Sequence, residues 1–326
     1  MVAYICEIMK KIAIITRDCA GVNAAIRSVV RTACGYKIEV IGVLKGYDGL
    51  VDGKFITLGR SSVSGIINLG GTFLKTSRSK RFLTDVGQKQ AVNNIQEQKI
   101  EGIIVIGGNG SLTGAHLLAT KYKIPVVGIP ATIDNDIAGV DLSIGADTAV
   151  NVALDAVDKI RDTATSLERI FIVEVMGRES GYIALQVALA GGCEEVLFPE
   201  KEFTIKAMCS EIQQGNVKGK SSWIIIVAEG KAKAHDVARI ITKKTGFETR
   251  VAVLGHIQRG GHPTAVDRIL ASQLGNYAVK VLRDGRTDVC VSMKNDKIVT
   301  IPLSVTIQPK KIKVAETYKL IKLLTK

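Results

Sequence analysis

Two acidic residues, Asp134 and Asp136, stand two positions apart in the stretch PATIDNDIAG, directly after the apolar run IPVVGI. On an extended loop this spacing points both carboxylates to one side, so one could accept a proton while the other helps to hold a metal ion. A polar turn held by hydrogen bonds from its own Asp and Asn side chains accounts for the same residues. The stretch therefore supports two interpretations, a catalytic pair and a structural turn.

A glycine-rich turn, GGNGS, offers a second kind of chemistry. It follows the apolar run 100–106 and precedes the helical spacing of Leu112, Ala115 and Leu118. Glycines let a backbone approach a phosphate, and the N–H groups that open a helix attract anions, so the turn is a candidate phosphate cradle. A cation-assisted phosphate site usually has a carboxylate in such a turn, whereas position 109 holds the neutral Asn109.

Four arginines accompany other apolar runs. Arg178 in VEVMGRESG and Arg259, with His256, in LGHIQRGGHP follow such runs, Arg169 stands in LERIF, and Arg250 directly precedes VAV. One arginine at a strand end is commonly a solvated cap, but four of them, which we expect at the carboxyl ends of strands, favour a phosphate site. No G-x-S-x-G or Cys–His nucleophile accompanies them, so the chemistry indicated is phosphoryl transfer.

The elements that must position these residues alternate along the chain. Runs rich in Val and Ile, such as KIAIIT, GIIVIGG and IFIVEVMG, are followed by glycine and then by an amphipathic segment. This pattern is typical of parallel strands buried on both faces, so the predicted fold class is α/β, with ligands at the carboxyl ends of strands. The helix expected in DTAVNVALDAVDKIRDTA is long enough to bridge two domains, and without a linker the domains should interleave.

The composition argues against a membrane-spanning, a secreted or a nucleic-acid-binding protein. The chain has 326 residues, 46% hydrophobic and 23% charged, which favours about two folded domains. No apolar run approaches the roughly 20 residues of a membrane span, and no secretory signal is present, so a cytoplasmic location is expected. The charge of +13 is spread along the chain and aromatic residues make up 5%, which argues against nucleic-acid binding.

The six cysteines show no C-x-x-C pair, which argues against a zinc site and against disulfides. We expect them to be buried or incidental, apart from Cys19 in a loop.

The tail from Val291 should form a final strand and a helix with an apolar stripe through Val314, Tyr318, Ile321 and Leu324. Its lysines should form a solvated face rather than a membrane-binding one.

Six motifs carry a family resemblance. GGNGSLTGA, PATIDNDIAG, VEVMGRESGYIAL, AEG, GHIQRGGHPTAVDRILAS and the early VNAAIRSVVR resemble those of bacterial ATP-dependent 6-phosphofructokinases, over nearly the whole chain to about residue 290. The resemblance implies two interleaved three-layer α/β/α domains with mostly parallel sheets. Residues 1–145 plus 258–308 would form the larger ATP-binding domain, and 146–257 plus 309–326 the smaller fructose 6-phosphate-binding domain.

The resemblance also implies an activity. The γ-phosphoryl group of ATP would pass to the 1-hydroxyl of fructose 6-phosphate, with Mg²⁺, in a glycolytic, allosterically regulated homotetramer. Asp134 would be the general base, Thr132 would lie in the substrate loop, and Arg178 would stabilise the transferring group. The residues implied to bind the sugar phosphate are Thr132, Ile133, Asp134, Arg169, Met176, Gly177, Arg178, Glu229, Arg250, His256 and Arg259, with Arg169 and Arg250 reaching from a neighbouring subunit.

The donor and effector sites follow from the same resemblance. Nucleotide binding is implied for Tyr47, Arg78, Gly108, Asn109, Gly110 and Ser111, and metal binding for Asn109 and Asp136. Pyrophosphate users of the family carry an acidic residue where Gly110 stands and a lysine where Ala131 stands, so the small residues here favour ATP. An effector site between subunits, for ADP or phosphoenolpyruvate, is implied by Arg27, Arg31, Arg60, Arg161, Gly192, Glu194, Lys218 and Lys220.

The donor side departs from the family pattern in three places. The loop TRDCAGVN is shorter by two residues than the usual phosphate loop and lacks its paired glycines, and Arg17 there could replace lost donors or block the pocket. Asn109 stands where the family has a metal-placing aspartate, and RSKRF after Arg78 lacks an aromatic residue that the family often has. A charge pair at about 4 Å is worth roughly 4 kcal/mol at an effective dielectric of 20, part of it in the ground state.

These departures leave two hypotheses. The lost charge predicts a rate that is roughly ten to a thousandfold lower, not abolished. The first hypothesis is therefore an ATP-dependent 6-phosphofructokinase with an atypical donor site. The second is a catalytically impaired homologue or regulatory subunit that binds sugar phosphate and effector without turnover.

Overall fold

The computed structural model describes residues 9–310 and 314–325. These residues form two compact α/β units. The first holds the described residues up to Gly145 together with Gly261–Lys310, and the second holds Ala146–Gly260 together with the described residues after Lys310. The family resemblance implies divisions after residues 145, 257 and 308, and the second and third divisions of the structure lie three and two residues later.

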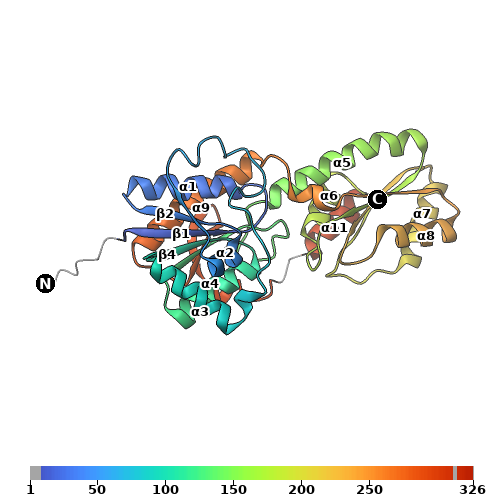
Figure 1. The fold of residues 1–326 in the computed structure, drawn as a ribbon. Helices are drawn as coiled ribbons and strands as arrows, with labels where there is room; N and C mark the ends of the chain where they lie inside the picture. Colours follow the sequence, from blue (N-terminus) through green and yellow to red (C-terminus); the bar gives the residue numbers. More distant parts are fainter. Residues whose placement is uncertain (1–8, 311–313, 326) are drawn as a thin grey trace. The chain divides into compact units, whose positions relative to one another are not determined.

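A seven-stranded sheet forms the centre of the first unit (Figure 1). Its strands, in spatial order, are β11 (Lys297–Pro302), β10 (Val289–Lys294), β5 (Val126–Pro130), β4 (Gly102–Gly107), β1 (Lys11–Thr16), β2 (Glu39–Val43) and β3 (Phe55–Leu58). The five inner strands run parallel, while β3 and β11 pair antiparallel at the two edges. The predicted run KIAIIT is β1, and every residue of β4 is buried, because helices cover both faces of the sheet.

Helices cover this sheet on both sides. The helices α1 (Val22–Gly35) and α9 (Ala265–Arg283) lie side by side on one face, and α3 (Asp85–Glu97) and α4 (Asn109–Tyr122) lie on the other (Figure 1). Three short helices complete the unit, namely α2 (Gly46–Asp52), η1 (Arg81–Leu83) and α10 (Leu303–Thr306). A buried apolar cluster that includes Ile15, Val105 and Leu112 joins the sheet to α4.

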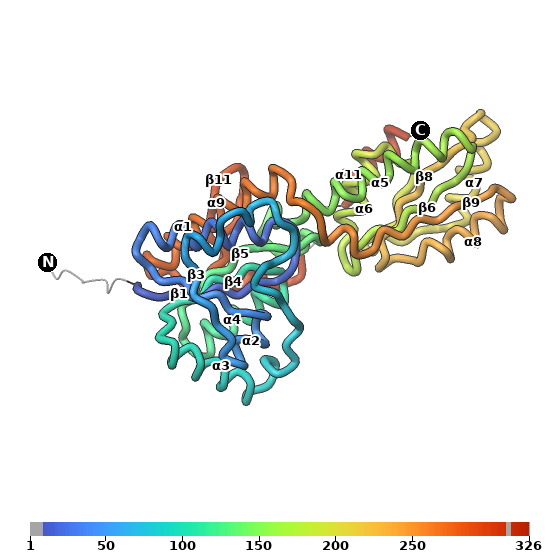
Figure 2. Tube along the Cα trace, turned by 45° about the horizontal axis from the view of Figure 1, so that its top comes forward, coloured from blue at the N-terminus to red at the C-terminus, as the bar shows by residue number. Residues whose placement is uncertain are grey.

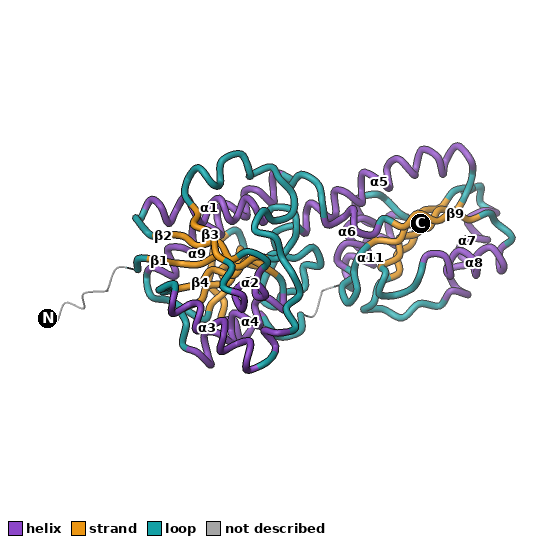
Figure 3. Tube along the Cα trace, viewed as in Figure 1, coloured by secondary structure: helices purple, strands orange, loops and turns teal. Residues whose placement is uncertain are grey.

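The second unit is built on a four-stranded parallel sheet. The spatial order is β7 (Glu195–Leu197), β8 (Trp223–Ala228), β6 (Ile170–Val175) and β9 (Thr249–Val253). The helices α5 (Ala146–Leu167), α6 (Tyr182–Ala190) and α11 (Ala315–Leu324) lie on one face, and α7 (Ile205–Val217) and α8 (Ala234–Thr245) on the other (Figure 2). The short helix η2 (Gly255–Arg259) follows β9. The strands of each unit are enclosed by its helices (Figure 3).

Several expectations about single segments need correction. The whole of α5, the helix that is long enough to bridge two domains, belongs to the second unit. The tail lysines are not all solvated, because the partly buried Lys322 lies 3.0 Å from a Glu195 oxygen and 2.6 Å from a Glu211 oxygen. Cys19 is as buried as most of the other described cysteines, all of which are free thiols, and Cys6 lies outside the described residues.

The described residues of the tail form two strands and two helices, more than the one strand and one helix expected. In α11 the side chain of Ile321 is buried, whereas that of Leu324 is exposed. Among the described helices, none combines the length and the apolar character that crossing a membrane requires.

Candidate active site

The glycine turn and the acidic loop meet at one edge of the first sheet. β4 and β5 are parallel neighbours, with Gly107 opposite Pro130, so the segments that follow them leave the sheet side by side. Gly108 is the residue before α4, and a Cβ at this position would lie 3.3 Å from the Cβ of Thr132. The two motifs singled out from the sequence therefore form one surface at the carboxyl ends of the strands.

Asn109 and Asp136 form a direct contact in this surface. The Asn109 side-chain amide donates a hydrogen bond of 2.8 Å to Oδ2 of Asp136. The other polar atom of the amide, Asn109 Oδ1, is buried and has no hydrogen-bond partner among the described residues. A buried carbonyl oxygen beside a carboxylate suits a small cation, which prefers oxygen ligands.

The loop that carries Asp134 is not extended, contrary to the geometry that we assumed for the acidic pair. Asn135 has a φ of 46°, in the left-handed region, and its side chain donates to the Asp141 carbonyl oxygen and accepts from the Ser143 N–H. Asp134 N–H donates to Thr132 Oγ1 over 3.3 Å. The structural interpretation is therefore correct for Asn135, and it leaves the roles of the two aspartates open.

Two further residues define this loop. Lys310 donates hydrogen bonds of 2.7 Å to the carbonyl oxygens of Asn135 and Val140. Burial lowers the pKa of Lys310, and the nearby charges of Asp136 and Asp141 act in the opposite direction. The side chain of Ile133 is buried, so only its backbone is available to a ligand.

Tyr47 fixes the start of α4. Its hydroxyl donates a 2.7 Å hydrogen bond to the carbonyl oxygen of Ser111, and its ring stacks on Phe82 with centroids 4.4 Å apart. Burial raises the pKa of the Tyr47 hydroxyl well above its usual range. Gly110, by contrast, stands in open space, because a Cβ there would meet no atom within 4 Å.

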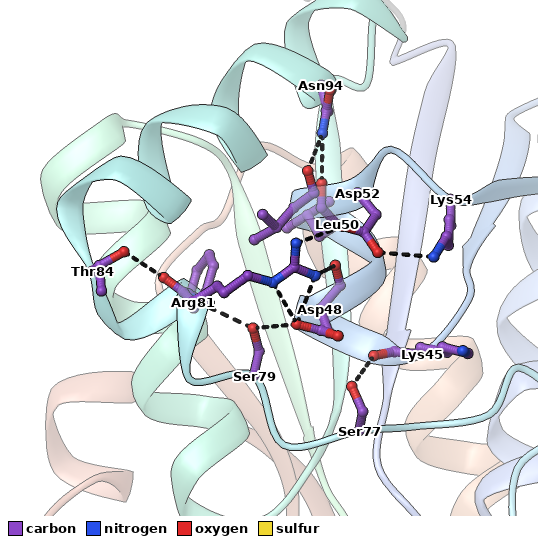
Figure 4. A network of polar contacts seen from close by, with 12 residues as sticks. Lys45, Asp48, Leu50, Asp52, Lys54, Ser77, Ser79, Arg81, Thr84 and Asn94 are labelled. Carbon is purple, nitrogen blue, oxygen red and sulfur yellow. Dashed lines mark hydrogen bonds and ion pairs between the residues drawn. The ribbon is translucent and has the colours of Figure 1, made fainter.

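A polar network braces the loop that carries Arg78 (Figure 4). Arg81 lies 2.9 Å from an Asp48 oxygen and 2.6 Å from an Asp52 oxygen, which ties η1 to α2. On the other side of Arg78, the Ser77 hydroxyl donates to the Lys45 carbonyl oxygen over 3.2 Å. Arg78 itself is exposed between these anchors.

Arg17 joins the same loop. Its Nη1 donates a 3.0 Å hydrogen bond to the Ser77 carbonyl oxygen. Arg17 thus anchors the loop before Arg78.

A second group of predicted residues gathers at the carboxyl ends of β6 and β8. The Glu229 N–H donates to the Val175 carbonyl oxygen over 2.9 Å, which joins the two chain segments that follow these strands. Gly230 is required there, because a Cβ at this position would lie 1.7 Å from the carbonyl oxygen of Arg178. The side chain of Arg178 is exposed to solvent at this edge.

The short helix η2 lies at the same edge. β9 pairs with β6 and ends beside it, with the Leu254 N–H donating to the Glu174 carbonyl oxygen over 3.0 Å. Gln258, fully buried in η2, accepts a 2.8 Å hydrogen bond from the Met176 N–H. The residues placed together at this carboxyl edge are Met176, Gly177, Arg178, Glu229, His256 and Arg259.

Arg169 and Arg250 lie at the opposite edge, so the expectation of four arginines at carboxyl ends is wrong. Arg169 immediately precedes β6 and Arg250 is the second residue of β9, and the two strands run parallel. Both arginines bind the Glu248 carboxylate. Arg169 Nε donates to one Glu248 oxygen over 2.8 Å, and Arg250 forms an ion pair with the other.

Comparisons with known proteins decide the family. The family model described as Phosphofructokinase matches residues 11–282. The chain belongs to the phosphofructokinase family. A relative from Thermotoga petrophila named ATP-dependent 6-phosphofructokinase is 51% identical over 305 residues, which cover 93% of this chain and 96% of that protein. A relative of the same name from Bacillus subtilis is 49% identical over 293 residues, which cover 89% of this chain and 92% of that one.

Solved structures of the phosphofructokinase family share the fold. Phosphofructokinase from Saccharomyces cerevisiae is 34% identical, with a TM-score of 0.85, and the match covers 97% of this chain but 47% of the yeast chain. This chain therefore spans about half of that chain. A pyrophosphate-dependent phosphofructokinase from Marinobacter aquaeolei, 23% identical and with a TM-score of 0.85, shows likeness of fold alone.

The residues implied for effector binding in this phosphofructokinase family member divide between the two units. Arg27, Arg31 and Arg60 belong to the first unit, and Arg161, Gly192, Glu194, Lys218 and Lys220 to the second. Within the second unit, Lys220 lies 3.1 Å from a Glu194 oxygen. Arg161 donates to the Gly192 carbonyl oxygen over 3.1 Å. The use of the two sets as one site stays a prediction.

Sequence reasoning missed several residues that shape these surfaces. Arg81, Gln258, Lys310 and Glu248 all bind partners far away in the sequence, so no local pattern indicates them. Glu248 is a partial exception. It stands two positions before Arg250, and residues i and i+2 of a strand project to the same face, so this one pairing was available from the sequence.

Proposed function

We propose that the chain transfers the γ-phosphoryl group of ATP to the 1-hydroxyl of fructose 6-phosphate, giving fructose 1,6-bisphosphate and ADP. The observation that carries this proposal is the identity of about half of all residues, over nine-tenths of both chains, with proteins named ATP-dependent 6-phosphofructokinase. The open space at Gly110 supports ATP as the donor, because a bulkier acidic residue there would fill it.

The first unit would supply the base and the donor site. Asp134 would take the proton of the 1-hydroxyl as the phosphoryl group is transferred, a role that needs a carboxylate at hydrogen-bonding distance from the hydroxyl. The Thr132 hydroxyl accepts a hydrogen bond from the Asp134 N–H, and this loop would position the sugar hydroxyl that receives the phosphoryl group. ATP would lie along the turn from Gly108 to Ser111, where the first N–H groups of α4 favour anionic phosphate.

The residues present fit a bound Mg²⁺. Asn109 Oδ1, buried without a partner among the described residues, and the Asp136 carboxylate beside it would hold the ion. Mg²⁺ commonly takes one or two protein ligands and completes its shell with water and phosphate oxygens, which agrees with the lack of any group of three or more acidic, His or Cys ligands in the described ranges. When bound, Mg²⁺ supplies positive charge to the donor phosphates.

The second unit would bind the sugar phosphate. Arg178, exposed at the carboxyl edge, would stabilise the charge of the transferring group. Met176 and Gly177 would line the sugar, Glu229 and His256 would bind its hydroxyls, and Arg259 would hold the 6-phosphate.

A second copy of the chain would complete this site. Arg169 and Arg250 lie at the amino edge of the sheet, separated from Arg259 by the length of β6, whose 6 residues span about 20 Å at roughly 3.3 Å each. They are therefore poorly placed to hold the same phosphate within one copy. This supports their role as residues contributed by a neighbouring subunit of a homotetramer, with ADP or phosphoenolpyruvate as effectors at a further interface.

The test measures fructose 1,6-bisphosphate formed by purified protein from fructose 6-phosphate and Mg²⁺, with either ATP or pyrophosphate. We expect product with ATP, no product in the Asp134→Asn variant, and fructose 6-phosphate binding retained by that variant. Product with pyrophosphate alone would contradict the choice of donor. Binding of fructose 6-phosphate without product from either donor would instead identify the impaired or regulatory homologue.

The shared site has its own test. Asp134→Asn inactivates one side of the site and Arg250→Ala the other, so each variant alone should lose activity. Denatured together and refolded, they should regain activity, because about a quarter of the mixed sites would carry an intact Asp134 from one copy and an intact Arg250 from another. An inactive mixture of correctly assembled protein would contradict a site built from two copies.

A further inference from the structure

The parallel ladder between β6 and β9 stops where β9 turns into η2. The last register pair joins Glu174 to Val253, and the Leu254 N–H donates to the Glu174 carbonyl oxygen over 3.0 Å. The bonds of a parallel ladder are evenly spaced, so the next one would run from the Met176 N–H to the Leu254 carbonyl oxygen. The strand turns away before that bond, because Leu254 is already helical, with φ −77° and ψ −40°.

The side chain of Gln258 takes the place of the strand carbonyl that β9 no longer offers. Its Oε1 accepts the Met176 N–H over 2.8 Å, a length typical of a backbone ladder bond. Gln258 is fully buried, and of the five residues of η2, all within the described range, it alone is buried. The amide therefore continues the hydrogen bonding of β6 past the end of β9, and it ties η2 to the first residue after β6.

The other polar atom of the same amide shows that Gln258 does more than fill space. Gln258 Nε2 is buried and has no hydrogen-bond acceptor among the described residues, which is unfavourable. Turning the amide over would set its NH₂ group against the Met176 N–H, so its orientation is fixed. An apolar side chain would avoid the unsatisfied donor but would leave the Met176 N–H without its acceptor. The acceptor oxygen is therefore the atom for which an amide is needed here.

The geometry of η2 extends this one contact to two groups of the proposed sugar-phosphate site. A 3₁₀ helix has three residues per turn, so side chains three positions apart, here His256 and Arg259, lie on the same side of it. Gln258 is directed into the core instead. Anchoring Gln258 on Met176 fixes the rotation of η2 about its own axis, and with it the direction in which His256 and Arg259 project.

We propose that Gln258 is a positioning residue of the sugar-phosphate site. It touches no ligand, since its side chain is fully buried. Its hydrogen bond to the Met176 N–H holds η2 against the turn that carries Gly177 and Arg178, so that groups from two chain segments meet one ligand. The identity of that ligand, fructose 6-phosphate, rests on the proposed function, whereas the alignment of the two segments does not.

The test variant is Gln258→Met, which keeps nearly the same length and volume and removes the acceptor. Two effects on stability oppose each other in this variant, because the unsatisfied Nε2 disappears while the Met176 N–H loses its partner. We therefore expect a melting temperature within about 4 °C of the parent. Gln213→Met, the same substitution at an exposed position on α7 of the same unit, is the matched control.

Steady-state kinetics separates positioning from damage to the fold. In Gln258→Met the KM for fructose 6-phosphate should rise by roughly tenfold, because a displacement of about 1 Å in positioning groups can cost as much as a hundredfold. The KM for ATP should stay within about twofold, because the first unit is proposed to bind the nucleotide. A merely destabilised protein contains fewer active molecules, which lowers the apparent turnover number and leaves both KM values unchanged. Gln213→Met should match the parent throughout.

Hydrogen exchange gives a readout that needs no substrate. Mass spectrometry of overlapping peptides that contain Met176 should show its amide exchanging at least about tenfold faster in Gln258→Met than in the parent, because the bond that protects it is lost. The amides in the middle of β6 should keep the exchange rates of the parent.

Faster exchange at Met176 together with a raised KM for fructose 6-phosphate supports the proposal. In folded Gln258→Met, a KM for fructose 6-phosphate within twofold of the parent, or an equal rise in both KM values, overturns it. If Gln258→Met fails to fold by circular dichroism, Gln258→Asn decides. This variant keeps an amide but is one methylene shorter, so its KM for fructose 6-phosphate should rise by about fivefold or more, and an unchanged KM overturns the proposal.

Failure of the proposed function is a separate outcome. If the parent forms no product and binds no fructose 6-phosphate, the proposed function fails. The exchange rate of the Met176 amide then decides the alignment of the two segments by itself, and a rate unchanged in Gln258→Met overturns it.

Discussion

Replacing Asn109 by aspartate should make the thermal stability of the first unit depend on Mg²⁺. The parent carries a 2.8 Å hydrogen bond from the Asn109 amide to Asp136. In Asn109→Asp this bond becomes a contact between two carboxylates. Two unit charges at about 4 Å interact by roughly 4 kcal/mol at an effective dielectric of 20, and the lost hydrogen bond contributes about 1 kcal/mol.

Relaxation lowers this cost. Asn109 is partly exposed, so solvent screens the pair, and one of the two carboxyl groups can keep its proton. A net destabilisation of about 2 kcal/mol at neutral pH without metal is the expected result. For a domain of 150 to 250 residues this corresponds to a melting temperature lower by roughly 4 to 8 °C.

Mg²⁺ should reverse the effect, since a divalent cation between two carboxylates replaces repulsion by attraction. Calorimetric melting with EDTA and then with about 10 mM Mg²⁺ is the assay, because ligand binding to the folded state raises stability by mass action. Asn109→Ala, which loses the hydrogen bond without gaining a charge, is the matched control and should show a smaller loss and little response to Mg²⁺.

The same variant tests the lost charge in catalysis. If Asn109 limits transfer, Asn109→Asp should raise the turnover number by roughly tenfold to a thousandfold with saturating ATP and Mg²⁺. The reasoning is refuted if the variant melts no lower than the parent in EDTA, or if Mg²⁺ raises the melting temperatures of parent and variant equally.

Further predictions concern the donor loop and the carboxyl edge. The hydrogen bond from Arg81 lowers the pKa of Asp48, so the stability that this pair contributes is present above the ordinary carboxyl pKa of about 4 and is lost as the pH falls through the lower value of the folded state. The melting temperature of Asp48→Asn should therefore fall less than that of the parent between pH 5 and pH 3. Gly230→Ala would force a Cβ to within 1.7 Å of the Arg178 carbonyl oxygen, so turnover should fall by about a hundredfold. Gly35→Ala, with open space around it, should leave turnover unchanged.

Most inner strands could be predicted from the sequence because each is buried on both faces. The run KIAIIT coincides with β1, and GIIVIG with β4, since continuous apolar residues leave no other location than the centre of a sheet. The edge strand β3 escaped prediction for the converse reason, and only one strand was expected where β10 and the edge strand β11 lie. Each edge strand is only partly buried and alternates little, so its residues resemble those of a loop.

The candidate site was predictable where it depends on strand direction. Segments that follow parallel neighbours must leave the sheet at one edge, so the turn of Asn109 and the loop of Asp136 had to meet. Lys310 was not predictable. It returns to this loop from 170 or more residues away in the sequence, and its apparent place in a lysine-rich tail gave the opposite expectation.

The two pairs of arginines show what strand direction alone determines. Arg178 and Arg259 follow their strands, whereas Arg169 and Arg250 come at the start of theirs. Their positions in the sequence relative to the strands therefore already place the two pairs at opposite edges of the sheet. The sequence does not show that β6 and β9 are neighbours in the sheet, and this pairing lets Glu248 bind both arginines of the amino edge. A phosphate that reaches these arginines therefore meets side chains whose charge Glu248 already partly neutralises. The phosphate and the Glu248 carboxylate compete for the same two arginines. The affinity for the phosphate therefore depends on how strongly Glu248 holds the arginines as well as on the arginines themselves.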